Sequence, residues 1–241
     1  MKKIIIVIPT YNEVNNINSL LKKIAALGIT NINILIVDDN SPDGTAAIVE
    51  KLQNKYPWVY LLKRKAKEGL GIAYRAGFHW ALEHQAEVVG EMDSDLSHQP
   101  EDLANLINAF QNGVEVVIGS RRVSGGKIIG WSWWRLFTSW GAMSTARLLL
   151  RLKTKDVTSG FRLYTRRALQ QIPWAKVKSS GYAWQEELIF LCERANLKII
   201  EVPITFIDRK IGKSKLSFAD VLEFFYTLIR LLRQKAKRRP I

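Results

Sequence analysis

Cysteine is almost absent from this sequence: Cys192 is the only one among 241 residues. A single cysteine excludes a disulfide within the chain and is typical of a protein in a reducing compartment. Because Cys192 lies in an apolar stretch, we expect it to be buried and unreactive. No charge-free apolar run approaches the roughly 18 residues needed to span a bilayer, and the apolar run after Met1 leads into a polar loop rather than a cleavage site. The sequence therefore predicts an intracellular protein without a transmembrane segment.

Glycine-rich nucleotide-binding motifs are also missing. The first apolar run is followed by Pro9-Thr10-Tyr11-Asn12-Glu13 instead of Gly-x-Gly-x-x-Gly, and no Gly-x-x-x-x-Gly-Lys-[Ser/Thr] occurs. Gly69 and Gly71 lack a third glycine at the required offset, so they indicate a permissive turn. These absences disfavour the commonest dinucleotide-binding oxidoreductases and the P-loop nucleotidases.

Acidic residues are scarce relative to basic ones: 22 against 36, a formal net charge of +14. Such an excess implies an anionic partner, whether nucleic acid, an acidic membrane surface or a phosphorylated substrate. Six basic residues lie close together near the C-terminal end with no acid among them: Arg230, Arg233, Lys235, Lys237, Arg238 and Arg239.

Apolar runs alternate with helical patterns along the first half of the chain. They predict strands at 3–8, 32–37, 59–62, 86–89 and 114–119, and helices at 15–27, up to 52, at 70–82 and at 100–110. The length of 241 residues suits one globular α/β domain. Because the strand runs are almost continuously apolar, we expect a largely parallel sheet covered by helices on both faces.

Charged side chains follow several of these predicted strands. In open α/β sheets, ligands bind beyond the carboxyl ends of the strands. Those ends carry one basic and several acidic residues here, namely Glu13, Asp38, Asp39, Asp93, Asp95 and Arg121. We expect them to share one crevice.

Asp93 and Asp95 follow the fourth predicted strand and are one residue apart. Alternate residues of an extended backbone point the same way, so both carboxylates could face one divalent cation. Such oxygen ligands suit Mg²⁺ or Mn²⁺, which one or two carboxylates often hold together with substrate phosphates. An alternative stays open, in which Ser97 or Gln99-Pro100 begins a helix and the two acids only stabilise its positive end.

Four motifs, taken together and in this order, resemble those of the family 2 glycosyltransferases of the GT-A fold. They are residues 8–13 (Ile-Pro-Thr-Tyr-Asn-Glu), 37–45 (Val-Asp-Asp-Asn-Ser-Pro-Asp-Gly-Thr), 93–95 (Asp-Ser-Asp) and 160–164 (Gly-Phe-Arg-Leu-Tyr). A fifth, 208–216 (Asp-Arg-Lys-Ile-Gly-Lys-Ser-Lys-Leu), narrows the resemblance to the polyprenyl-phosphate, or dolichyl-phosphate, mannose synthases. The resemblance extends from about residue 4 to about residue 225.

The resemblance implies a Rossmann-like GT-A sheet and an inverting transfer of mannose from GDP-mannose to a polyprenyl or dolichyl phosphate, with Mg²⁺ or Mn²⁺ as cofactor. The positions that match the donor-nucleotide residues of the family are Pro9, Tyr11, Glu13, Val37 and Asp39. Asp93 and Asp95 match the metal-binding pair, and Ser94 between them lines the donor site. Some relatives have a glutamine ligand where this chain has Ser97, so a third protein ligand stays open.

The resemblance also implies roles around the acceptor. Arg121, Arg135 and Ser139 match residues that receive the acceptor phosphate, and Arg209 and Lys215 match a loop that closes on the donor. We expect Asp95 and the three acceptor-side residues to carry the catalytic step, with Arg121 also contacting the donor. A lipid phosphate monoester is mostly dianionic near neutral pH, so it needs no protein base to attack the anomeric carbon.

The stretch 131–152 has the pattern of a helix suited to a membrane surface. Trp131, Trp134 and Trp140 supply amphipathic bulk, and Arg135 and Ser139, four residues apart, share one helix face. Burial of the tryptophans in an ordinary core stays open as the alternative.

A second amphipathic helix is predicted after Ser217, which resembles a capping box with Asp220. Its apolar face runs through residues 218–232, and the basic cluster follows. We therefore expect a glycosyltransferase domain at 1–216 and a C-terminal helix and basic tail at 217–241 that bind anionic lipid. A docked helix with a merely solubilising tail stays open. Many relatives carry transmembrane helices beyond this point, so we expect a cytoplasmic protein that is peripheral to the membrane or relies on separate membrane-anchoring subunits.

Three more residues stand out less clearly. Glu186 and Glu187 lie on a predicted helix at 182–195, near the acceptor side by resemblance or on a solvated face. His98 could help a metal site, but a cap or surface position is the expectation. Two alternative functions stay open: an enzyme of the same fold that uses UDP-glucose or another donor, and a basic nucleic-acid-binding module, which would have no use for the Asp93 and Asp95 pair.

Overall fold

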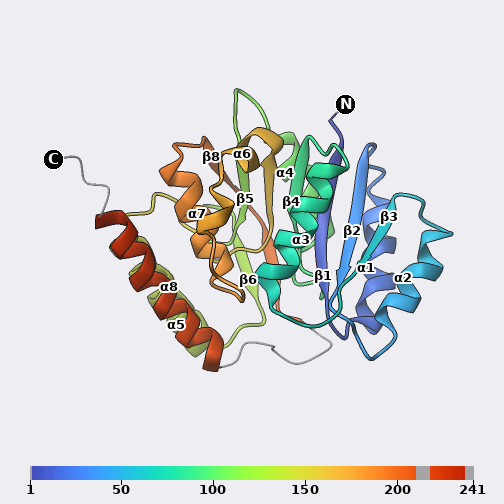
Figure 1. Cartoon of the computed structure of the whole chain (residues 1–241), viewed down its shortest axis with the longest axis horizontal. Helices are drawn as coiled ribbons and strands as arrows, with labels where there is room; N and C mark the ends of the chain where they lie inside the picture. The colour runs from blue at the N-terminus through green and yellow to red at the C-terminus, as the bar shows by residue number, and fades with distance from the viewer. Residues whose placement is uncertain (1, 210–217, 237–241) are drawn as a thin grey trace.

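The computed structural model describes residues 2–209 and 218–236 and alternates strands with helices, as expected (Figure 1). The strands are β1 (Ile4–Thr10), β2 (Ile32–Asp38), β3 (Val59–Lys63), β4 (Val88–Glu91), β5 (Val116–Ser120), β6 (Lys127–Ile129), β7 (Arg162–Thr165), β8 (Ile199–Pro203) and β9 (Thr205–Ile207). The helices are α1 (Val14–Ala26), α2 (Thr45–Gln53), α3 (Leu70–Glu83), α4 (Leu103–Asn108), α5 (Trp133–Leu150), α6 (Arg166–Gln171), α7 (Trp184–Arg194) and α8 (Phe218–Ala236). Single 3-10 turns span Pro100–Asp102 and Trp174–Lys176. No helix in the described part of the chain is both long and apolar enough to span a bilayer.

Within the described residues, the main sheet has the strand order β3-β2-β1-β4-β7-β5-β8. All neighbouring strands are parallel except where β7 pairs with β4 and β5 in the antiparallel sense. The predicted mostly parallel sheet is confirmed. The reversed strand β7, which covers part of the fourth motif, was not predicted as a strand. A small parallel pair of β6 and β9 lies beside the main sheet.

The sheet separates two apolar cores, which confirms helices on both faces. On one face α1, α2 and α4 bury side chains such as Leu20, Val49 and Leu106. On the other face α3, α6 and α7 bury larger ones, such as Phe78 and Trp184. The central strands are buried along nearly their whole length, because helices cover them on both sides.

Close packing of α3 on the sheet depends on Gly77. A Cβ atom at Gly77 would lie 2.3 Å from Cγ1 of Val7 and 3.1 Å from Cγ2 of Val37, so any larger residue would push the helix off the sheet. Val37 itself is fully buried under this helix.

Helices α5 and α8 contact each other and form a separate layer at the end of the molecule near α7 (Figure 1). The inner side chains of this layer join the core under α7, among them Ala146 on α5 and Leu231 on α8. Glu223 fastens α8 to the loop before α7, because its carboxylate accepts the backbone N–H groups of Ser180 (2.7 Å) and Gly181 (3.0 Å). This arrangement leaves α5 and α8 as two walls beside the carboxyl ends of the central strands.

Candidate active site

A cavity of about 500 Å³ lies between the ends of β4 and β5 and the helices α5, α7 and α8. Its polar lining includes five predicted site residues and the two lesser candidates His98 and Glu186. The five are Asp93, Arg121, Arg135, Ser139 and Arg209. Its apolar lining comes from Leu70, Phe206 and, on α8, Val221, Phe224 and Phe225. A polar end beside an apolar wall suits a ligand that carries both a charged and a hydrocarbon part.

Asp93 and Asp95 occupy the turn directly after β4. The backbone N–H of Asp93 donates to Nδ1 of His98 (3.2 Å), and Oδ1 of Asp95 accepts the backbone N–H of Ser97 (3.0 Å). Desolvation, followed by the negative charge of Asp95, raises the pKa of Asp93 to about 7. Neither acid caps a helix, since the 3-10 turn at Pro100 and α4 both begin without a side-chain cap. A helical turn does begin at Pro100, as the alternative interpretation predicted, and the role of the two acids beside it stays a prediction.

The pair has the chemistry of a partial metal site. Two neighbouring carboxylates, of which Asp95 helps to raise the pKa of Asp93, offer oxygen ligands whose repulsion a divalent cation would relieve. Among residues 2–209 and 218–236, no three His, Cys, Asp or Glu side chains are grouped to hold a metal. The hydroxyl of Ser97, at the position where some relatives have a glutamine, is buried without a hydrogen-bond partner in that part of the chain. The residues thus fit a cation completed by ligands from a substrate rather than one enclosed by protein.

Arg209 reaches this pair from the end of the described segment after β9. Its Nη2 lies 3.2 Å from Oδ2 of Asp95, so a guanidinium lies directly beside the acids. Lys215, the other expected loop residue, lies outside the described residues.

His98 is buried, with only 1% of its surface exposed, so the expectation of a cap or surface position is wrong. Burial lowers its pKa to about 4, so the imidazole is neutral at physiological pH. Because Nδ1 accepts from the backbone of Asp93, the ring proton lies on Nε2. The ring stacks on Phe161 at 5.1 Å, and His98 thus fixes the backbone that carries the acidic pair.

The expected nucleotide-side residues lie at the ends of β1 and β2, next to β4 in the sheet. Asp39 pairs with Arg64 (2.7 Å), and Lys67 lies over the ring of Tyr11 at 4.4 Å. Glu13 is buried and accepts from Nδ2 of Asn16 (2.7 Å). Pro9 is half-buried and pairs with the fully buried Val37 across the two strands. None of the five expected residues lines the 500 Å³ cavity, so they form a second, adjoining part of the strand-end region.

The acceptor-side arginines each bind a carboxylate, and neither pairing was predicted from the sequence. Arg121 makes a bidentate pair with Asp156, with Nε–Oδ2 at 2.8 Å and Nη2–Oδ1 at 2.7 Å. Burial alone would raise the pKa of Asp156, but the charge and hydrogen bonds of Arg121 outweigh it and bring that pKa to about 2. Arg135 contacts both carboxylate oxygens of Asp208 at 3.0 Å. Both arginines thus lie at one cavity, and the positive charge of each is partly neutralised by its carboxylate partner.

A turn of the chain places these arginines around one aromatic ring. Gly130 has φ of +91°, a conformation that favours glycine, and directs the chain from β6 into α5. Trp131 follows, with Arg135 at 4.2 Å and Arg121 at 5.8 Å from its ring. No motif in the sequence links these three residues.

Glu186 and Glu187 are both buried, so the interpretation of a solvated helix face is wrong. Burial raises the pKa of Glu186 to about 7, and its Oε2 has no hydrogen-bond partner among the described residues. Glu186 lines the cavity. Glu187 accepts the backbone N–H of Ser179 (2.8 Å) and pairs with Arg230 of α8 (2.8 Å). The large apolar residues around these acids, Trp184 and Leu188, were the signal in the sequence that this helix is covered. Cys192, also on α7, is buried and free as expected.

The sheet with one reversed strand beside β4, and the acidic pair at the end of β4, define a GT-A glycosyltransferase. A family model described as glycosyl transferase family 2 matches residues 5–173. The chain belongs to glycosyltransferase family 2, as the resemblance of its motifs implied.

Individual relatives narrow the comparison. The undecaprenyl-phosphate mannosyltransferase of Micrococcus luteus is 40% identical over 215 residues, which cover 89% of this chain and 88% of the relative. The polyprenol monophosphomannose synthase of Mycolicibacterium smegmatis is 39% identical over 226 residues, 93% of this chain and 85% of the relative. The solved structure of the mannosyltransferase PcManGT from Pyrobaculum calidifontis, in complex with GDP-Man and Mn²⁺, has a TM-score of 0.63 at 17% identity and covers 100% of this chain and 65% of its own.

Proposed function

We propose that this protein transfers mannose from GDP-mannose to a polyprenyl phosphate, with inversion at the anomeric carbon. The observation that carries the proposal is the cavity beside β4, which places Asp93, Arg121 and Arg135 around one space with an apolar wall. The relatives named as undecaprenyl-phosphate and polyprenol mannosyltransferases support the sugar and the acceptor class.

On the donor side, Asp93 and Asp95 would hold Mg²⁺ or Mn²⁺, and the structure of PcManGT with Mn²⁺ supports a divalent cation. When bound, such a cation neutralises charge that develops on the leaving diphosphate. Ser94, which is buried in the turn between the two acids, would line the sugar-diphosphate subsite. Arg209, 3.2 Å from Asp95, would add positive charge on the same side. The guanosine would lie over the ends of β1 and β2, between Tyr11, Glu13 and Asp39.

On the acceptor side, Arg121, Arg135 and Ser139 would bind the phosphate of the lipid. Oγ of Ser139 lies 3.5 Å from Nη2 of Arg122, so the hydroxyl is already beside a cationic side chain. Guanidinium groups screen the repulsion between the dianionic acceptor and the donor and hold the two reactants in line. A phosphate oxygen then forms the new bond to the anomeric carbon as the bond to the GDP oxygen breaks. No proton has to be removed from the acceptor.

The layer of α5 and α8 would bind the membrane that contains this acceptor. Large apolar side chains on these two helices are exposed beside the cavity, with exposed fractions of 74% at Trp133, 60% at Phe137 and 67% at Tyr226. Among the tryptophans of the predicted interfacial helix, Trp134 and Trp140 are also exposed, whereas Trp131 is half-buried. We therefore propose an anionic membrane surface as the partner of this layer and a peripheral location at the cytoplasmic face.

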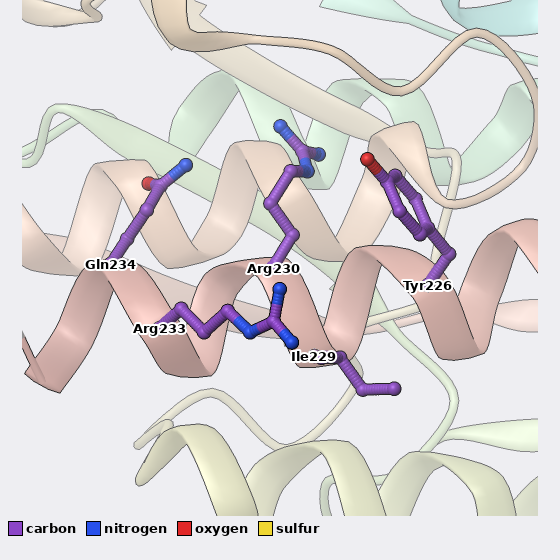
Figure 2. A pocket seen from close by; sticks show the side chains of 5 residues that line it. All are labelled: Tyr226, Ile229, Arg230, Arg233 and Gln234. Atoms are coloured by element: carbon purple, nitrogen blue, oxygen red, sulfur yellow. The ribbon is translucent and has the colours of Figure 1, made fainter.

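The basic cluster divides into different roles on α8. A small pocket of about 220 Å³ lies on this helix. In Figure 2, Arg230 extends to the same side of the helix as Tyr226, while Arg233 and Ile229 lie across the front. Arg230 is bound to Glu187, so it docks the helix instead of meeting lipid. Arg233 is exposed and available to headgroups, and Lys237, Arg238 and Arg239 lie outside the described residues. We propose that the glycosyltransferase domain spans residues 1–216 and the C-terminal helix and tail residues 217–241, although part of α8 also forms a wall of the cavity.

The test is transfer from several labelled nucleotide sugars, GDP-mannose and UDP-glucose among them, to undecaprenyl phosphate with Mg²⁺ or Mn²⁺. We expect the lipid extract to carry label from GDP-mannose and none without metal. Label from UDP-glucose alone would overturn the assigned donor, and tight, salt-sensitive DNA binding without any transfer would overturn the assigned class. A requirement for added membrane proteins would indicate separate anchoring subunits.

A further inference from the structure

The indole of Trp131 lies between the two arginines that line the cavity. The guanidinium carbon of Arg135 is 4.2 Å from the ring centroid, and that of Arg121 is 5.8 Å from it. Trp131 belongs to none of the family motifs in the sequence. It was predicted to lie on a helix at the membrane surface, but it precedes α5 and its N-cap Ser132. Its position calls for a specific explanation.

The two arginines differ in how firmly they are held. The side chain of Arg121 is 7% exposed and is fixed by Asp156 and by Thr158, whose Oγ1 accepts from Nη2 at 2.7 Å. The side chain of Arg135 is 40% exposed, and its carboxylate partner Asp208 is itself 29% exposed. An exposed ion pair contributes little free energy and does not hold a long side chain in one position. Arg135 therefore needs another contact to stay in place.

The ring of Trp131 supplies that contact and is itself fixed. Phe206 packs edge-on against the indole with centroids 5.6 Å apart, and the guanidinium of Arg121 also lies 5.3 Å from the ring of Phe206. Attraction between a guanidinium and an aromatic face is worth about 0.5–2 kcal/mol, more as water is excluded. The indole thus attracts both cations, although the cations repel one another.

We propose that Trp131 is a positioning residue of the acceptor-phosphate subsite, which holds the exposed Arg135 at a set separation from the buried Arg121. This inference rests on the proposed function. Without the ring face, Arg135 is free to turn toward solvent, and the phosphate is met by Arg121 alone. The cost falls on acceptor binding and leaves the donor site unchanged.

The test compares Trp131→Leu, which removes the ring, and Trp131→Phe, which keeps an aromatic face, with the parent protein. The ligand is geranyl phosphate, a short isoprenyl phosphate monoester, and binding is measured by calorimetry in detergent-free buffer. We expect the Kd to rise about tenfold in Trp131→Leu and two- to threefold in Trp131→Phe. In transfer assays the KM for the lipid phosphate should rise with little change in kcat. The Kd for GDP with Mn²⁺ and the melting temperature should stay at parent values.

Two comparisons separate positioning from bulk. Trp134→Leu changes an exposed tryptophan in the first turn of α5, three residues after Trp131, and should leave geranyl phosphate binding unchanged. In an Arg135→Ala background, Trp131→Leu should have less than about a twofold further effect, because the residue that it positions is gone. A parent protein that binds no geranyl phosphate would overturn the proposed function together with this inference. Parent-like binding by Trp131→Leu, or an undiminished effect in the Arg135→Ala background, would overturn this inference alone.

Discussion

The two halves of the molecule assemble their polar sites in different ways. In the N-terminal half, some strand-end groups bond to residues near in sequence: Asp38 accepts from Ser41, and Asp43 from Thr45, although Asp38 also accepts from Thr10, 28 residues away. In the C-terminal half, partners come from distant segments, as in the pair of Arg135 with Asp208, 73 residues apart. Local pairs leave compact motifs in a sequence, whereas distant pairs leave none. The N-terminal half is therefore easier to recognise in the sequence, because some of its strand-end contacts join residues that are close together in the chain.

The largest expected effect is in the acidic pair, where the two halves meet. We expect Asp95→Ala to lower metal-dependent transfer by about 10³-fold, because charge on the leaving diphosphate is no longer neutralised. Transfer rates and the melting temperature are measured together. The control is Glu101→Gln, which changes an exposed acid paired only with Lys23 at the surface. Normal turnover in Asp95→Ala would remove the metal assignment.

Most of the fold could be predicted from the sequence, and the reason is physical. Strands buried on both faces must be apolar along their length, so β1, β2, β4 and β5 are visible as runs in the sequence. The antiparallel strand β7 was missed because its four residues, Arg162–Thr165, include a buried arginine that looks like a surface residue. The Nη1 and Nη2 atoms of that arginine donate to the backbone carbonyls of Gln185 and Val157, and no local pattern in the sequence predicts such contacts.

The site was predictable to the same extent. Asp93 and Arg209 were predicted within motifs, and Arg121, Arg135 and Ser139 from the family resemblance outside them. The fold brings all five to one cavity. Their partners Asp156 and Asp208, and the aromatic spacer Trp131, depend on where separate loops meet. Burial of Glu186 was missed because an acid on a helix is usually solvated, and only the packing of α7 under α5 and α8 reverses that expectation.

The second prediction compares one buried ion pair from each half by removing the acid of each pair. Asp156→Ala leaves Arg121 buried without its bidentate partner, so we expect a loss of about 3–5 kcal/mol in the free energy of unfolding. Asp39→Ala removes a buried partner of Arg64, but Arg64 keeps a contact with Glu68, so a smaller loss of about 1–3 kcal/mol is expected. Urea unfolding measures both. Equal losses would show that the ion pair of Asp156 contributes no more to the free energy of unfolding than the ion pair of Asp39.

The third prediction concerns the buried Glu186, whose pKa is raised to about 7 in the folded protein. Between the ordinary pKa near 4.5 and about 7, the folded state binds more protons than the unfolded state, so stability falls as pH rises through that window. The groups that act on Glu186 are Arg162, Asp156 and Arg121. Glu186→Gln should remove up to ~3 kcal/mol of this pH dependence.

Thermal unfolding of the parent and of Glu186→Gln at a series of pH values from 4.5 to 8 measures the difference. Glu50→Gln, an exposed acid of the N-terminal half, provides the control and should leave the profile unchanged. Parallel profiles for the parent and Glu186→Gln would show that this carboxyl titrates normally.

The smallest expected effect tests whether the C-terminal half alone meets the membrane. Trp133 and Phe137 are exposed on α5 with no core to fill, so their replacement by serine should cost little folding stability. Removing two interfacial aromatic residues should weaken binding to vesicles of phosphatidylglycerol by about tenfold. Trp58→Ser, on the opposite half and partly buried, is the matched control and should bind vesicles as the parent does. If Trp58→Ser weakened vesicle binding as much as the double variant, the membrane contact would not be confined to the C-terminal half. Parent-like vesicle binding by the double variant would show that exposed apolar area on α5 is not what attaches the protein, and the attachment would then have to be electrostatic and lost in high salt.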